Sequence, residues 1–168
     1  MQEVSPGNYG LKDQIASLDW VQKYIAGFGG DPDRVTAFGE SVGGCAVNMH
    51  MMSDKPRFKR AIMQSGQARL IGPKTMAFHE KMYGMALATL KLDNLTKSAR
   101  VDLLKTMPLE KIMAVPPPEP MYQPCADGVL YKVVPYWGDL ADPKNKFDKP
   151  DWVEAVMFGE CKDDVRIM

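Results

Sequence analysis

The sequence has few histidines, few cysteines and no excess of charge of either sign. Its 168 residues include 2 His and 3 Cys, and 21 Lys and Arg balance 21 Asp and Glu. Nucleic-acid-binding proteins usually carry a basic excess, so this composition argues against a nucleic-acid partner. Cys45, Cys125 and Cys161 are too few and too dispersed for a disulfide framework or for a zinc site with closely paired cysteines. We therefore expect no metal site.

Long apolar runs are absent as well. No run approaches the ~18 residues that a membrane-spanning helix needs, so we expect no membrane span. Residues 1–7 lack the basic and apolar regions of a secretory signal. We expect a cytoplasmic protein if this N-terminus is genuine, and a secreted one if a longer precursor exists. The composition, 45% apolar and 25% charged, is that of an ordinary globular domain and leaves the oligomeric state open.

The spacing of apolar residues predicts helices. They are expected over 8–28, 42–52, 75–92, 97–107 and, more briefly, 109–115. Short runs of β-branched and aromatic residues predict strands over 34–38, 58–63 and 152–158. The strand, helix and strand between 34 and 63 form a βαβ unit, and such units build parallel sheets. Three prolines at 116–118 end the helical pattern, and the composition of 119–150 predicts an extended loop.

One motif at the predicted junction of strand and helix carries chemistry. It reads Gly39-x-Ser41-x-Gly43. In this context the motif is typical of a nucleophile elbow, a strained turn between a strand and a helix. The residues two positions before and after the serine must be small to avoid a clash, and the serine hydroxyl lies above the sheet edge where ligands bind. The N–H of Val42 would open the helix and face a developing oxyanion. The alternative is an ordinary glycine-rich turn in which Ser41 is the helix N-cap.

The segments around this motif closely resemble a known family. They are 7–14, 20–21, 28–32, 35–44 and 58–66, with weaker matches at 125–128 and 159–164. Together they resemble the type-B carboxylesterase/cholinesterase family of α/β-hydrolases. The resemblance implies an α/β class chain with a partial α/β-hydrolase fold, in which a parallel sheet core carries a helical insertion. It also implies one partial domain over 1–168 that lacks the N-terminal and C-terminal parts of the family's fold.

The resemblance also implies roles for individual residues. Ser41 corresponds to the nucleophile that attacks a small-molecule carboxylic ester, and Val42 to an oxyanion-hole donor. Asp164 occupies the position of the triad acid, and we favour it over Asp163 and Glu160. The resemblance implies no metal or organic cofactor for this chemistry.

The remaining elbow positions are Gly39, Glu40, Gly43 and Gly44, which match the family's acidic, glycine-rich turn. We expect Glu40 to be a buried carboxylate that holds the turn through hydrogen bonds. Val165 replaces a glycine of the family, so the turn after the acid is expected to differ.

The general base is the part of the triad that the sequence does not supply. The order of the triad in this fold is serine, acid, histidine, and both His50 and His79 precede Asp164. We therefore expect the base beyond residue 168, and the oxyanion-hole segment before residue 1. Two hypotheses follow: a serine esterase of which this chain is a central fragment with little activity of its own, or a catalytically inactive cholinesterase-like binding or remnant protein.

Overall fold

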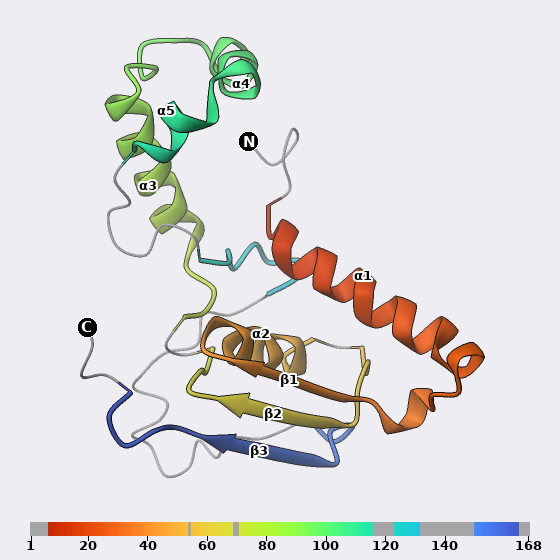
Figure 1. Ribbon diagram of the computed structural model, residues 1–168. Coiled ribbons are helices and arrows are strands. Elements are labelled where there is room, and N and C mark those ends of the chain that lie inside the picture. The colour runs from red at the N-terminus through yellow and green to blue at the C-terminus, as the bar shows by residue number, and fades with distance from the viewer. Residues whose placement is uncertain (1–6, 54, 69–70, 116–122, 132–149, 165–168) are drawn as a thin grey trace. The chain divides into compact units, whose positions relative to one another are not determined.

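The computed structural model describes residues 7–53, 55–68, 71–115, 123–131 and 150–164 (Figure 1). The chain divides into two compact units, one of residues 1–73 with 124–168 and one of residues 74–123. Each unit is described by itself. The expected proline break at 116–118, most of the expected loop over 119–150 and Val165 lie outside the described residues.

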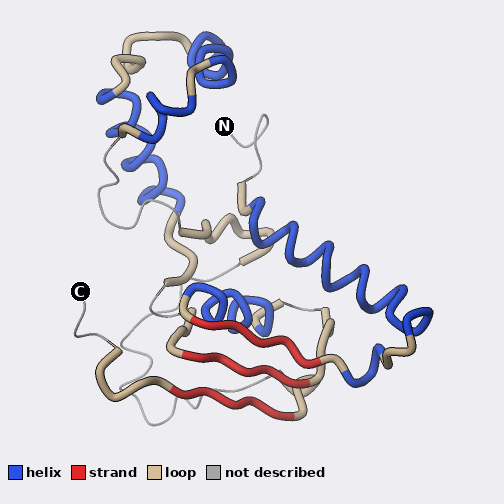
Figure 2. The backbone as a smooth tube through the Cα atoms, in the orientation of Figure 1, coloured by secondary structure: helices blue, strands red, loops and turns tan. Residues whose placement is uncertain are grey.

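A parallel sheet forms the centre of the first unit. Its strands are β1 (Thr36–Glu40), β2 (Arg60–Gln64) and β3 (Ala155–Gly159), in the spatial order β1-β2-β3 (Figure 2). Both strand pairs are parallel, with Glu40 opposite Gln64 and Gln64 opposite Gly159. All three strands therefore end at the same edge of the sheet. The expected parallel α/β arrangement is confirmed.

Helix α2 (Val42–Met51) covers one face of this sheet, as Figure 1 shows. Every residue of α2 from Gly44 onward is buried, because the helix packs on the sheet with one side and contacts other segments with the rest. Its Val47 and Met51 form a core cluster with Ala61 and Met63 of β2 and with Phe58. Burying the Val, Met and Phe side chains of this cluster, each contributing about 1.5–3 kcal/mol, holds the helix on the sheet.

The opposite face of the sheet is open among the residues that the structure describes. Phe38, Ile62 and Met157 lie side by side on it, because they are register partners in β1, β2 and β3. The Phe38 and Met157 side chains remain 74% and 66% exposed. An amphipathic element normally covers such a row in a layered α/β fold.

Strand β3 begins later than the sequence pattern indicated. The expected strand over 152–158 is observed at Ala155–Gly159. Trp152 and Val153 precede it in a turn, where the N–H of Val153 donates to the carbonyl oxygen of Pro150 at 2.9 Å. Val153 is completely buried, and the Trp152 ring packs edge-on against Phe58 with centroids 5.3 Å apart. These two residues are apolar because they complete the core, and not because they pair in the sheet.

The N-terminal helix matches its expected span. Helix α1 (Tyr9–Tyr24) continues into a 3-10 turn, η1 (Ile25–Phe28), and ends at Gly29, whose φ of 81° favours glycine. A second 3-10 turn, η2 (Pro32–Arg34), leads into β1, and the Asp31 carboxylate caps it by accepting from the N–H of Asp33 at 2.9 Å.

The second unit contains three helices among its described residues. They are α3 (Met76–Thr89), α4 (Lys97–Thr106) and α5 (Leu109–Met113). Thr75 and Thr96 cap the first two, since their side-chain hydroxyls accept hydrogen bonds from the N–H groups of Phe78 and Ala99. The helices expected over 75–92, 97–107 and 109–115 are all observed.

A buried histidine joins α1 to α2. The Nε2 atom of His50 lies 2.8 Å from Oε1 of Gln14, and the His50 side chain is 5% exposed. Since an amide oxygen only accepts, Nε2 carries the proton of a neutral ring. Burial, reinforced by the nearby positive charge of Arg57, lowers the pKa of His50 from 6.5 to about 4.

Acidification is therefore expected to destabilise this packing. An unfolded His50 binds its proton near pH 6.5 whereas the folded one resists it until about pH 4, so stability falls as the pH drops through that window. His50→Gln keeps an amide donor for Gln14 and removes the titration. Urea unfolding at pH 7, 6, 5 and 4 is expected to show a smaller loss of stability for this variant than for the wild type. His79→Gln serves as the control, and an equal loss in all three proteins would contradict the assignment.

Candidate active site

Ser41 lies at the sharp turn between β1 and α2. Its backbone has φ 51° and ψ −120°, a conformation that residues with side chains rarely adopt and that costs of order 1–3 kcal/mol. Two backbone hydrogen bonds hold it. The N–H of Ser41 donates to the carbonyl oxygen of Gln64 at 2.8 Å, and the Ser41 carbonyl oxygen accepts from the N–H of Cys45 at 3.0 Å. The sheet thus fixes one side of the residue and the helix fixes the other.

The Ser41 side chain does not cap α2. The residue occupies the N-cap position, but its hydroxyl accepts no hydrogen bond from the first turn of the helix. Ser41 is exposed, and no described residue is hydrogen-bonded to its hydroxyl. Ser41 is therefore the N-cap residue by position, as the alternative expected, but without the side-chain hydrogen bond and the extended backbone of an ordinary N-cap serine.

Three glycines make the turn sterically possible. A Cβ on Gly39 would overlap the backbone of Gly43 and lie 2.8 Å from the nitrogen of Gly44. A Cβ on Gly44 would lie 3.0 Å from the carbonyl oxygen of Gly66. A Cβ on Gly66 would collide with the carbonyl group of Ser41 itself. The loop after β2 therefore packs directly beneath the serine.

Gly43 does not share this constraint. A Cβ on Gly43 would meet nothing within 4 Å, so the expectation that both glycines of the motif must be small is confirmed for Gly39 and wrong for Gly43. The reason is directional: Gly39 faces the first turn of α2, whereas the missing side chain of Gly43 would extend into open space.

The two residues on either side of Ser41, Glu40 and Val42, are both exposed. Val42 is the first residue of α2 and is 61% exposed. Its N–H is one of the four that a helix cannot satisfy internally. Glu40 is exposed too, and no described residue is hydrogen-bonded to its carboxylate. The expectation of a buried Glu40 is wrong, because Glu40 lies with Phe38 on the sheet face that α2 does not cover.

Asp164 is held at the same edge of the sheet by Ser65. Its Oδ2 accepts from the Ser65 hydroxyl at 2.6 Å and from the N–H of Cys161 at 2.7 Å. The hydrogen bond from Ser65, and then that from Cys161, lower the pKa of the Asp164 carboxyl below its usual value. Ser65 follows β2 directly, has φ 50°, and donates its N–H to the Gly159 carbonyl oxygen at 2.8 Å.

The register of the sheet brings these groups together. The three strands end on residues that lie opposite one another, namely Glu40, Gln64 and Gly159. The residues that directly follow them are Ser41, Ser65 and Glu160. The hydrogen bonds from Ser41 to Gln64 and from Ser65 to Gly159 extend the ladder beyond the strands themselves. Ser41 and the Ser65–Asp164 pair consequently share the carboxyl edge of the sheet.

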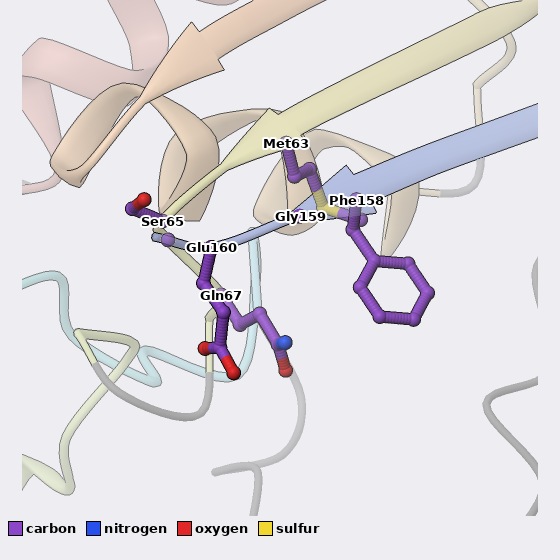
Figure 3. A pocket seen from close by; sticks show the side chains of 7 residues that line it. Met63, Ser65, Gln67, Phe158, Gly159 and Glu160 are labelled. Carbon is purple, nitrogen blue, oxygen red and sulfur yellow. The ribbon is translucent and has the colours of Figure 1, made fainter. Parts of the chain in front are cut away.

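A small cavity of about 140 Å³ opens beside Ser65 at this edge (Figure 3). Figure 3 shows the Phe158 ring directed away from the Ser65 and Glu160 side chains. Residues of β2, β3 and the loops after them line the cavity: Met63, Ser65, Gly66, Gln67, Phe158, Gly159 and Glu160. Its polar side consists of a hydroxyl, an amide and a carboxylate.

Neither histidine is assembled with Ser41 by the described contacts. His50 lies nine residues along α2, roughly 13 Å up the axis at 1.5 Å per residue, and its ring is committed to Gln14. His79 belongs to α3 in the other unit, where its ring lies edge-on against Phe78 with centroids 5.5 Å apart. Within the described ranges, no group of three or more His, Cys, Asp or Glu side chains is placed to hold a metal ion.

Sequence reasoning missed Ser65 and Gly66. Their signal was present, since Gln64-Ser65-Gly66 ends the strand next to the one that carries Ser41. Applying the rule that sites form at the carboxyl ends of parallel strands to this second strand would have identified them.

The parallel sheet, the strand–turn–helix around Ser41 and the acidic residue after β3 define a partial α/β-hydrolase fold. A family model described as the carboxylesterase family matches residues 1–140. The chain therefore belongs to the carboxylesterase family.

Individual relatives agree with this assignment. The chain is 41% identical over 127 residues to cocaine esterase of Homo sapiens, which covers 74% of this chain and 22% of that protein. It is 51% identical over 79 residues to acetylcholinesterase of Electrophorus electricus, covering 45% of this chain and 12% of that protein. A solved carboxylesterase of Geobacillus stearothermophilus is similar with a TM-score of 0.71 and 26% identity, covering 95% of this chain and 32% of that chain. The chain thus spans less than a third of the length of these relatives.

In the part that the structure describes, no helix is both long enough and apolar enough to cross a membrane.

The glycines around the turn give a direct test of its packing. Gly66→Ala places a methyl group against the Ser41 carbonyl and is expected to lower the free energy of unfolding by about 1–3 kcal/mol. Gly43→Ala, the matched control, has open space and is expected to change it by less than about 1 kcal/mol. Urea unfolding measures both. Equal losses in the two variants would show that the loop after β2 does not press against Ser41.

The Ser65–Asp164 hydrogen bond gives a second test. Ser65→Ala removes the largest cause of the lowered Asp164 pKa, so that pKa is expected to rise. A pH titration of the Asp164 carboxyl carbon by NMR measures it, with Ser98→Ala as the control that leaves it unchanged. An Asp164 pKa that is the same in the wild type and in Ser65→Ala would rule out this contact.

Proposed function

We propose that Ser41 is the nucleophile of a carboxylic ester hydrolase. The observation that carries the proposal is the strained Ser41 backbone at the β1–α2 turn, with the hydroxyl neither capping the helix nor bonded to a described residue. Family membership and relatives named as esterases support the same chemistry. The substrate is a small-molecule carboxylic ester.

The proposed reaction proceeds through an acyl-enzyme. The Ser41 Oγ attacks the ester carbonyl carbon and loses its proton to a general base, and the alcohol leaves with that proton. Water then releases the acid from the serine. The Val42 N–H, at the N-terminus of α2, donates to the oxyanion of each tetrahedral intermediate, where a missing donor would cost about 2.7–4 kcal/mol.

Asp164 is the proposed acid of the triad. Its task is to orient the imidazole of the base and to stabilise the imidazolium, for which it must be ionised and fixed. The hydrogen bonds from Ser65 and Cys161 supply both properties, since they favour the charged carboxylate and restrict its position. We assign the base to a histidine outside residues 1–168, because His50 is buried, neutral and bonded to Gln14.

Labelling with a fluorophosphonate probe tests the nucleophile. In the 168-residue chain, where the proposed base is missing, the adduct is expected to form slowly but on Ser41 in preference to every other serine, because Ser41 is exposed at the helix N-terminus. Mass spectrometry of peptides locates it. Ser41→Ala is expected to abolish the adduct, and Ser98→Ala, which removes an exposed serine of α4, to leave it unchanged. An adduct that survives in Ser41→Ala would contradict the assignment.

The assignment of the base predicts the activity of the 168-residue chain alone. Removing a triad member leaves serine hydrolases only about 10³–10⁴-fold catalysis over water. Turnover of p-nitrophenyl butyrate by this chain is therefore expected to be negligible and equal in the wild type and Ser41→Ala. Turnover that Ser41→Ala abolishes would show that a base within these residues serves Ser41. Negligible turnover of this chain is expected under both hypotheses, so an inactive, binding member of the family is favoured only if a longer chain that carries the proposed histidine also shows neither labelling nor turnover.

A further inference from the structure

We propose that Asn94 is an acceptor for N-linked glycosylation. Asn94-Leu95-Thr96 is the one Asn-x-Ser/Thr triplet among the 168 residues. This triplet, with any residue but proline in the middle, is the sequence that oligosaccharide transfer to asparagine requires. The site lies in the second unit and does not depend on the proposed esterase function.

The structure places the triplet in a turn between α3 and α4. Asn94, Leu95 and Thr96 are all exposed. No described residue is hydrogen-bonded to the Asn94 amide. A bulky, hydrophilic glycan is tolerated at an exposed turn, because it displaces no packed side chain there.

A buried side chain and several hydrogen bonds hold this turn in place, so Asn94 stays at the surface in the folded protein. The Leu92 side chain is 6% exposed and anchors the turn in the unit's interior. The Arg100 guanidinium donates to the carbonyl oxygen of Leu92 at 3.1 Å and to that of Asp93. The N–H of Leu95 donates to the Leu92 carbonyl oxygen at 3.2 Å. These bonds use the backbone on both sides of Asn94 and leave its side chain uncommitted.

The other described asparagines are committed to the fold. Asn48 is 7% exposed, and its Oδ1 accepts from the N–H of Ala68 at 2.9 Å. The Asn8 amide donates to Cys125 and Asp127 and accepts from the N–H of Cys125. Asn94 is thus the described asparagine whose amide is available, and it is also the one with the required threonine.

The reaction takes its sugar from a lipid-linked oligosaccharide diphosphate. A bond forms between Nδ2 of Asn94 and the anomeric carbon of the first sugar, while the bond from that carbon to the diphosphate oxygen breaks. The amide nitrogen gives up one proton, and the lipid diphosphate leaves with the bonding electron pair. No oxidant or reductant is needed.

The structure separates the two roles of Thr96. Its hydroxyl completes the acceptor triplet, and it also caps α4 by accepting from the N–H of Ala99 at 3.3 Å. Thr96→Asp keeps a capping oxygen and removes the hydroxyl, whereas Thr96→Ser keeps both. Loss of modification in the first variant and retention in the second would therefore not be an effect of helix stability.

The test is translation of the 168-residue chain behind a cleavable secretory signal in the presence of endoplasmic reticulum microsomes. One oligosaccharide is expected on the wild type and on Thr96→Ser, and none on Asn94→Gln or Thr96→Asp. A wild-type chain that stays unmodified in microsomes that glycosylate a control secretory protein would overturn the proposal. So would a modification that persists in Asn94→Gln.

A second measurement tests the structural part of the proposal. The oligosaccharide on the folded chain is expected to be released by an endoglycosidase without denaturant, at the rate seen after denaturation. Release only after denaturation would contradict an exposed Asn94.

Discussion

The hydrogen bond from the Ser41 N–H to the Gln64 carbonyl oxygen is the contact on which the candidate site depends. It continues the β1–β2 ladder one residue past the end of β1, at the position where the chain must reverse into α2. Because the sheet holds this N–H, the peptide cannot relax into an ordinary capping conformation. The cost of the unusual backbone is offset by the burial of α2 on the sheet.

The end of β2 organises both halves of the site. Its Gln64 accepts from Ser41, its Ser65 holds Asp164, and its Gly66 leaves room for the Ser41 carbonyl. Two loops that are more than a hundred residues apart in sequence therefore meet through one short segment. This arrangement explains why a chain spanning 22% of one esterase relative and 32% of another still places a serine and a carboxylate at one sheet edge.

Local patterns predicted the elements well, and contacts distant in sequence account for what they missed. The helices and the first two strands lie close to their expected spans, because periodicity and glycine stops are local signals. Trp152 and Val153 were assigned to a strand, since burial in a core and burial in a sheet select the same apolar residues. Glu40 was expected to be buried, and the face on which it lies depends on where α2 packs. The position of Gly66 at the end of a strand could be recognised in the sequence, but its contact with Ser41, 25 residues away, is encoded by no local pattern.

Amide hydrogen exchange of the folded chain, followed by NMR, tests the central claim most directly. The account predicts that the Ser41 amide exchanges as slowly as the amides of β1 and β2, because it is bonded to Gln64. The adjacent Val42 amide, the proposed oxyanion donor, is predicted to exchange rapidly. A rapidly exchanging Ser41 amide next to a protected Val42 amide would contradict the account, since the turn would then present its serine from an ordinary helix cap.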